Sequence, residues 1–384
     1  MKQALPRGVI ALGFVSMFMD ISSESVHALL PLFLVGTLGA STFIVGLIEG
    51  LGEATAQISK LFSGVLSDRT GKRKPLAVLG YGLSAVTKPL FALAGGAGAV
   101  LTARLADRVG KGIRGAPRDA LVADMVPEAQ RGAAYGLRQS MDTVGALLGP
   151  LLAMALLALT GDVRTVFWLA ILPAMIAVAV LVIYVREPET ASPPKARVAL
   201  TRASLVALGR PFWGVVLLGA VLTLARVSEA FLILKAGDVG LQIGMAPVVL
   251  MLFNLVYALS AWPVGVLSDR IGQRGLLLAG FGLLVLADLL LAVASSVEMV
   301  LLGVALWGLH MGMTQGLLAA AVARHAPASM RATAFGAFNL VTGFALLAGN
   351  AIAGGLWSLV GPAATFGAGA VLAAVGLLGL IRRG

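Results

Sequence analysis

Long apolar stretches separated by short polar connections are the main pattern of this chain of 384 residues. Each stretch is roughly 20 residues or longer, the length that an α-helix needs to cross the hydrocarbon core of a bilayer. Because unpaired backbone groups are costly in hydrocarbon, such segments are expected to be helices. The pattern predicts twelve of them, at residues 8–38, 42–66, 76–94, 99–123, 132–160, 163–185, 212–235, 244–267, 276–294, 297–323, 332–359 and 363–380.

The second half of the chain repeats the first. The segment Gly-Val-Leu-Ser-Asp-Arg occurs at 64–69 and again at 265–270, and an Arg-x4-Gly element opens later apolar stretches at Arg131 and Arg331. The sizeable non-apolar stretch at 186–210 is charged and proline-containing, which is typical of a linker. We therefore predict an all-α integral membrane protein of two pseudo-symmetric bundles. The predicted parts are an N-terminal six-helix bundle at 1–185, a cytoplasmic linker at 186–210 and a C-terminal six-helix bundle at 211–384.

Composition and charge support a membrane location. Hydrophobic residues make up 59% of the chain and charged residues 12%, which is too apolar for a soluble domain. The net charge of +11 falls mainly on connections that share one side if the helices alternate, so the positive-inside bias predicts that both termini are cytoplasmic. We expect a multi-pass protein of the bacterial inner membrane. The connections are too short to build a nucleic-acid-binding face, and Asp20 and Glu24 favour a retained first helix over a cleaved signal peptide.

Ionisable residues lie inside several predicted membrane helices of the first half, where charge is costly and usually functional. Asp20, Glu24 and His27 share one face of the first helix, and Arg104, Asp107 and Arg108 share a face of the fourth. A basic group beside carboxylates lets one of them bind and release a proton. The candidates for proton coupling are Asp20, Glu24, Glu49, Glu53 and Arg108. The alternative is a set of fixed ion pairs that holds the helices together, which we also expect of Arg138 with Asp142.

Basic side chains on the fourth helix also bear on the solute, because Arg and Lys attract carboxylate or phosphate groups. This pattern favours a small anionic or zwitterionic organic solute, although the carboxylates of the first and second helices counter the field. The second half adds polar intramembrane groups, among them an Arg226–Glu229 pair and a candidate titrating group, His310. The substrate-binding candidates are Arg104, Arg108, Lys111, Arg226, Glu229, Asn254, His310, Gln315 and Asn339.

Other chemistry finds little support in the sequence. Asp20, Glu24 and His27 could offer oxygen and nitrogen ligands from one helix, but neither a cysteine nor a second nearby histidine completes a metal site. We therefore assign no metal and no cofactor. The sequence has no nucleotide-binding loop, nucleophile elbow or zinc-protease pattern, so we expect neither an ATP-driven pump nor an enzyme.

The loop Gly64-x3-Asp68-Arg69-x-Gly71-Lys72-Arg73-Lys74 resembles the signature between the second and third helices of the major facilitator superfamily. Two further elements are similar to those of the family: Arg108-x2-Lys111-Gly112 in the fourth helix, and Gly145-x3-Gly149-Pro150, which resembles a mark of antiporter branches. The alternative for the glycine element is a kink that packs on a neighbouring helix. The resemblance implies alternating access, with gating by Asp68, Arg69, Arg73, Asp124 and Asp269, and with Asp124 as a partner of Arg73.

Together these observations predict a secondary active transporter of a small organic solute, coupled to protons, with export by antiport as the leading form. One alternative is a proton symporter that takes up a metabolite or a metal chelate. An alternative of another class is a membrane sensor or scaffold that binds solute without moving it. The expected partners are the solute, protons and membrane lipid, with no nucleic acid, and we expect a monomer.

Overall fold

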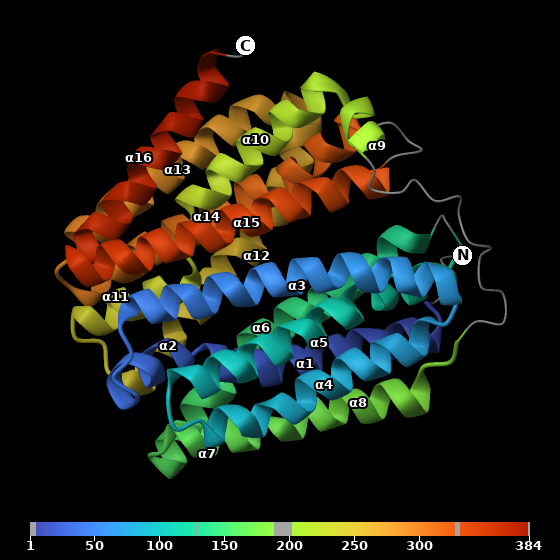
Figure 1. Cartoon of the computed structure of the whole chain (residues 1–384), viewed down its shortest axis with the longest axis horizontal. Helices are drawn as coiled ribbons and strands as arrows, with labels where there is room; N and C mark the ends of the chain where they lie inside the picture. The colour runs from blue at the N-terminus through green and yellow to red at the C-terminus, as the bar shows by residue number, and fades with distance from the viewer. Residues whose placement is uncertain (1–4, 128–129, 188–201, 327–330, 383–384) are drawn as a thin grey trace. The chain divides into compact units, whose positions relative to one another are not determined.

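The computed structural model describes residues 5–127, 130–187, 202–326 and 331–382, and within these ranges the secondary structure is entirely helical (Figure 1). Ten helical segments of the described residues are long and apolar enough to cross a membrane. The other two predicted membrane ranges are occupied by α3 (Thr42–Thr70) and α5 (Ala97–Asp124), whose length suffices but whose sequences carry more charge. The predicted all-α membrane fold is confirmed.

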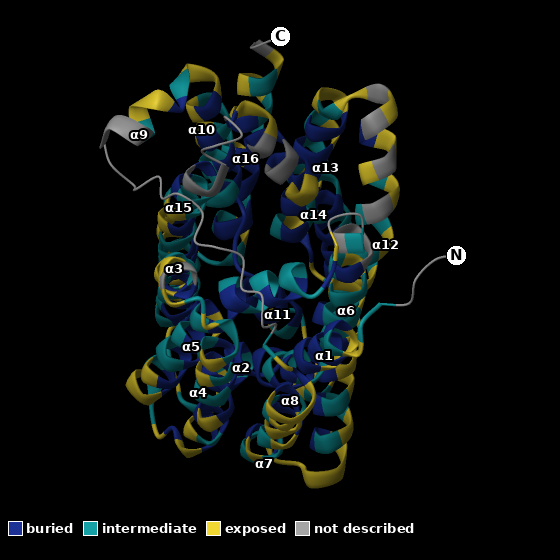
Figure 2. Cartoon of the chain, turned by 90° about the vertical axis from the view of Figure 1, so that its right-hand side faces the viewer, coloured by how far each residue is buried: buried dark blue, intermediate teal, exposed yellow. Residues whose placement is uncertain are grey.

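The first compact unit consists of Met1–Phe33 and Thr55–Ala196. Within it α1 packs on α6 and α8, and α4 packs on α5. Leu12, Val15, Met19 and Tyr81 lie in its apolar core, and Figure 2 shows α1 buried over much of its length. This unit contains all of α5 and the second part of α3. Its other helices are α1 (Arg7–His27), α2 (Leu30–Leu32), α4 (Arg73–Leu93), α6 (Arg131–Thr160), α7 (Val163–Leu169) and α8 (Ile171–Tyr184).

The second compact unit consists of Leu34–Ala54 and Arg197–Gly384, so it includes the first part of α3. This part of α3 lies against α15, where Thr42 Oγ1 is 2.8 Å from Ser358 Oγ. In the same unit α14 packs on both α12 and α13, and α16 packs on α13. Its further elements are a π-helix (Phe33–Thr37), α9 (Arg202–Ala207), α10 (Gly209–Ala225), α11 (Glu229–Asp238), a 3-10 helix (Ile243–Met245), α12 (Pro247–Ile271), α13 (Gln273–Val293), α14 (Val297–His325), α15 (Arg331–Leu359) and α16 (Pro362–Arg382).

Prolines divide two segments that the apolar pattern predicts as continuous helices. The first predicted helix, 8–38, stops being regular after His27, because Pro31 has no N–H to give to the His27 carbonyl. The predicted helix 163–185 is divided after Leu169, and Pro173 has the same relation to the Leu169 carbonyl. Each break therefore lies four residues before a proline.

A third break, between α10 and α11, has another cause. Residues 212–235 are predicted as one helix, but Arg226, Val227 and Ser228 lie between two helices, and none of the three is proline or glycine. The Ser228 backbone N–H donates to Asn350 Oδ1 at 2.7 Å, and Ser228 Oγ accepts from the Ala230 N–H at 3.2 Å as an N-cap. A side chain of α15 thus replaces a helical hydrogen bond, so the prediction of a continuous helix is wrong here.

We expect Asn350→Ala to destabilise this break, because the buried Ser228 N–H would lose its acceptor. Leaving a buried donor unpaired costs about 1–3 kcal/mol, so thermal unfolding of the purified protein should occur at a lower temperature. Thr342→Val on the same helix is the control, since the hydrogen bonds of Thr342 Oγ1 to described residues go to carbonyls of its own helix. Equal unfolding temperatures for Asn350→Ala and Thr342→Val would contradict this account.

Candidate functional site

A buried ion pair between α4 and α5 forms the centre of a charged cluster in the first unit. Lys88 Nζ lies 3.0 Å from Asp107 Oδ1, and their side chains are 1% and 6% exposed. Lys88 Nζ also donates to Ser23 Oγ of α1 at 3.1 Å, and Thr87 Oγ1 donates to Asp107 Oδ1 at 3.4 Å. The pair therefore ties α1, α4 and α5 together out of contact with solvent.

Further basic side chains extend this cluster along the buried face of α5. Arg104, Arg108 and Arg114 are 3%, 8% and 5% exposed. Arg108 is among the charged neighbours of Asp107, and the Arg114 guanidinium lies 4.8 Å from the centre of the Tyr81 ring. Lys111, predicted on the same face, is exposed. The charged side chains Arg104, Arg108 and Arg114 of α5 are thus buried within the first unit, and Lys88 is a member of the cluster that our candidates missed.

His27 takes part in the cluster through Arg104. Arg104 Nη2 lies 3.0 Å from His27 Nδ1, and because a guanidinium only donates, Nδ1 is assigned as the acceptor and the ring proton to Nε2. The lone pair of the His27 ring is therefore engaged by the guanidinium in this arrangement. Among the described residues, no group of three or more His, Cys, Asp or Glu side chains could hold a metal ion.

The carboxylates of α1 lie where α1 and α6 approach most closely. A methyl group at Gly145 would lie 2.9 Å from Asp20 Cβ, and one at Gly149 would lie 2.8 Å from Glu24 Cβ. The Gly145-x3-Gly149 element therefore packs against α1, as small residues do at membrane helix contacts. The charged neighbours of Asp20 include Arg114, Lys111 and Arg118 of α5 together with Asp142 of α6.

Several predicted pairs are present. Arg138 Nη1 lies 2.6 Å from Asp142 Oδ2, and Arg73 Nε lies 2.8 Å from Asp124 Oδ2, so both predictions are confirmed as contacts. Glu187 accepts hydrogen bonds from the Arg73 and Lys74 backbone N–H groups at the start of α4. The side chains of the other three predicted gating residues lie outside the described part of the chain: Asp68, Arg69 and Asp269.

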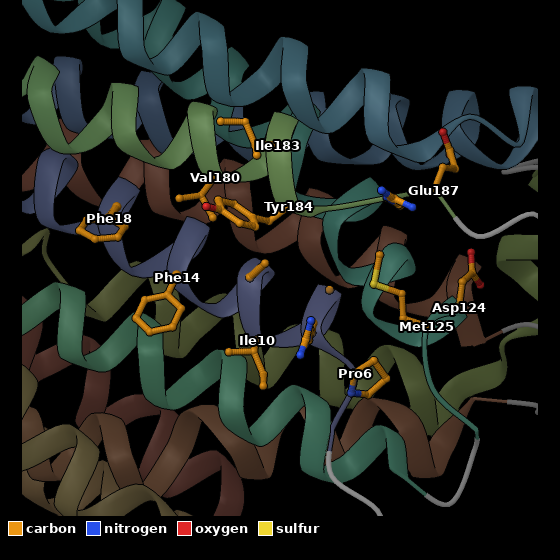
Figure 3. A pocket seen from close by; sticks show the side chains of 14 residues that line it. Pro6, Ile10, Phe14, Phe18, Asp124, Met125, Val180, Ile183, Tyr184 and Glu187 are labelled. Atoms are coloured by element: carbon orange, nitrogen blue, oxygen red, sulfur yellow. The ribbon is translucent and has the colours of Figure 1, made fainter.

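A cavity of ≈ 930 Å³ lies next to this end of the first unit, between α1, the end of α5 and α8 (Figure 3). Phe14, Phe18 and Ile183 give it apolar walls, while Asp124 and Glu187 lie toward one end. The predicted proton-coupling residues do not line it. The cavity is therefore a separate feature from the charged cluster.

In the second unit, polar side chains gather at the break between α10 and α11. Glu49 is 2% exposed, and its Oε2 accepts from Ser228 Oγ at 3.4 Å. Arg226 Nη1 donates to Gln315 Oε1 of α14 at 3.1 Å, and Glu229 is a charged neighbour of Arg226, as the sequence predicted. Two contacts, Glu49 with Ser228 and Arg226 with Gln315, thus lie at this break, and Ser228 is a residue that sequence reasoning did not select.

The remaining predicted residues of the second unit lie on α3, α12, α14 and α15. His310 is fully buried, and its Nδ1 bonds to the Gly280 carbonyl at 2.7 Å. Asn254 and Asn339 are half-buried on α12 and α15, and Glu53 is half-buried on α3. Asp288 is 1% exposed on α13 and was not selected. The rule that intramembrane ionisable groups are functional would have selected both Lys88 and Asp288.

Comparisons with known proteins agree in fold and family. The sequence model of the Major Facilitator Superfamily matches residues 11–234 and 230–383. An uncharacterised MFS-type transporter of Methanocaldococcus jannaschii is 33% identical over 383 residues, covering 97% of this chain and 94% of the relative. The multidrug resistance protein MdtH of Yersinia pestis is 30% identical over 156 residues, covering 41% of this chain and 39% of the relative.

Solved structures give the same answer for the fold. A POT family transporter in complex with a thioalcohol-conjugated peptide superimposes with a TM-score of 0.80 at 15% identity, covering 98% of this chain and 95% of the other. A helical membrane fold, a duplicated sequence and a family match along nearly the whole chain therefore lead to one conclusion. The chain belongs to the Major Facilitator Superfamily of membrane transporters.

Proposed function

We propose that this transporter is coupled to protons and moves a small anionic or zwitterionic organic solute. The proposed direction is export, and the proposed form of coupling is antiport. The observation that carries the proposal is the buried cluster of the first unit, in which Lys88, Arg104, Arg108 and Arg114 surround Asp107. Charge of this density is costly inside a membrane and is retained where it serves transport.

The cluster supports an anionic group on the solute because its buried charged members among the described residues are mostly basic. Of the five charged side chains, four are basic and Asp107 alone is acidic. Arg104 and Arg108 can bind a carboxylate or phosphate in bidentate fashion. Asp20 and Glu24 on α1 are half-buried and supply the carboxylates that a proton would use.

The form of coupling follows from what competes with the proton. The ammonium group of a zwitterion would replace the proton on Asp20 or Glu24, which gives antiport. A plain anion would bind better once a carboxylate is protonated and releases its basic neighbour, which gives symport, the alternative to the proposed antiport. Export is supported by the partial similarity to MdtH, whose name describes multidrug resistance.

We further propose an inner-membrane location with cytoplasmic termini, a two-bundle division at the 186–210 linker and gating by the Arg73–Asp124 pair. The monomeric state, the association with lipid and the roles of Asp68, Arg69 and Asp269 are part of the same proposal. Support comes from the basic connections and, for the pair, from its 2.8 Å contact.

The test of the function has two steps. A thermal-shift screen of the purified protein against anionic and zwitterionic metabolites, chelates and drugs identifies a ligand, because binding stabilises the folded state by mass action. Proteoliposomes then measure whether an imposed pH gradient drives that ligand across the membrane. A ligand that binds but does not move would support the sensor or scaffold alternative.

We expect the pH dependence of ligand binding to separate antiport from symport. Under antiport the apparent affinity rises with pH, because protons compete with the ammonium group. Under symport it falls with pH, because the carboxylate must first be protonated. Binding to Glu24→Gln and Asp20→Asn should depend less on pH than binding to the wild type, and Arg108→Ala should abolish pH-driven transport. Unchanged pH-driven transport in all three variants would place the coupling outside this cluster.

We expect Asp107→Asn to destabilise the protein by about 3–5 kcal/mol, because it leaves a buried lysine among other basic side chains. The double variant Lys88→Met with Asp107→Asn should regain much of that loss. Unfolding of the purified variants measures both, with Asp238→Asn as a control, since Asp238 is 43% exposed and pairs with Lys235. If the double variant also keeps its pH-driven transport, the Lys88–Asp107 pair is structural.

The topology generates its own prediction. Protease added to right-side-out cells should leave the 186–210 linker intact, because the positive-inside bias places it in the cytoplasm. The same protease added to inverted vesicles is the control and should cut there. Cleavage in intact cells would reverse the assigned orientation.

A further inference from the structure

Asp288 is a buried carboxyl in the middle of α13. It is 1% exposed, and Arg274 is the only other charged side chain of this helix. Asp288 Oδ2 and His310 Nε2 are buried and have no hydrogen-bond partner among the described residues, while the buried Trp307 Nε1 lies near enough to Asp288 to act on it as a donor. Buried polar atoms normally have partners, so a group of orphaned atoms on two packed helices requires an explanation.

Among the residues that the structure describes, no fixed cation is a charged neighbour of Asp288. From α14, Trp307 offers an uncharged indole N–H, and His310 already uses Nδ1 on the Gly280 carbonyl. From the end of α10, Arg226 bonds to Gln315 and to Met311 Sδ, and α16 has no ionisable side chain before Arg382. An ionised carboxylate in such surroundings would be very costly, whereas a protonated carboxyl would not.

A backbone carbonyl faces the same small space as the Asp288 carboxyl. A methyl group at Gly369 of α16 would lie 2.6 Å from Asp288 Oδ2 and 3.0 Å from the Ala225 carbonyl oxygen, so both oxygens face the space beside this glycine. Ala225 is the last residue of α10, beyond the final hydrogen bond from Arg226 N to the Leu222 carbonyl. Carbonyls at a helix end need outside donors.

The internal duplication gives this position a counterpart. Helices α13 and α14 begin at Gln273 and Val297, each 200 residues after α4 and α5 begin at Arg73 and Ala97. On this register Asp288 corresponds to Lys88, and Trp307 corresponds to Asp107. The first half therefore fills the position with a covalently fixed cation that pairs with its neighbour. The second half places an acid there, facing an uncharged donor.

We propose that Asp288 is a proton-binding site of the second half, in which its carboxyl O–H donates to the Ala225 carbonyl at the break between α10 and α11. Proton release leaves a buried carboxylate that attracts the Trp307 N–H and no longer donates to the Ala225 carbonyl, so occupancy of the site is linked to the backbone at the end of α10. A proton suits a site with one carboxylate and one carbonyl, because alkali and alkaline-earth cations require more oxygen ligands. The role of this proton in transport rests on the proposed proton coupling, but proton binding can be measured without any solute.

Infrared spectroscopy of the full chain in liposomes tests the site, because a protonated carboxyl has its own C=O stretching band. Asp288→Asn should lack one such band that titrates in the wild type. Gly369→Ala keeps the acid but adds a methyl group beside both oxygens, so it should shift the band. Gly367→Ala is the matched control, since a methyl group there meets no atom within 4 Å.

Identical carboxyl bands in the wild type and Asp288→Asn at every pH would overturn the proposal, as would a band that sodium removes at constant pH. If Asp288→Asn does not fold, Gly369→Ala decides: a shifted band supports the site and an unshifted band overturns it. Transport is scored separately. A titrating band without pH-driven flux would support this proton-binding site and contradict the proposed proton coupling. A pH-driven flux without the band would contradict this site and support the proposed coupling.

Discussion

Inside a bilayer no water is available to a backbone or side-chain polar group, and this constraint explains most of the structure. It makes every described membrane segment a helix. Where a helix is interrupted, another group must provide the missing hydrogen bond. The break between α10 and α11 meets this demand through Asn350, whose side chain accepts from the Ser228 N–H. The Asn350 side-chain amide of α15 thus stabilises the irregular backbone at this break.

The same constraint acts on charge. Lys88 and Asp107 are tolerable in the first unit because each neutralises the other at 3.0 Å. Elsewhere along α5, Arg104 contacts a histidine nitrogen and Arg114 lies over an aromatic ring. The cluster is therefore a connected set of contacts in which changing one member alters the electrostatic surroundings of the others. This property suits a protein that must respond to a proton or to a charged solute.

Sequence reasoning went far with the fold because length and apolarity determine membrane helices directly. It also found Arg73 with Asp124 and Arg138 with Asp142, pairs that follow from a family resemblance and from helical spacing. It missed the break at 226–228, because neither proline nor glycine marks it and its cause is Asn350, far away in the sequence. It missed Lys88 because a single lysine hardly changes the average hydrophobicity of the apolar stretch around it. The contact of Glu49 with Ser228 depends on tertiary packing, which periodicity cannot reveal.

The glycines of α6 have a consequence for electrostatics. At Gly145 and Gly149 the α6 backbone comes so close to α1 that an added methyl group would overlap the Cβ atoms of Asp20 and Glu24. The distance of both carboxylates from the basic side chains of α5 therefore depends on the volume of two uncharged residues on a third helix. A larger residue at 145 or 149 would change the electrostatic interaction between these carboxylates and the basic side chains of α5. Relatives could adjust their proton affinity in this way without altering a single ionisable group.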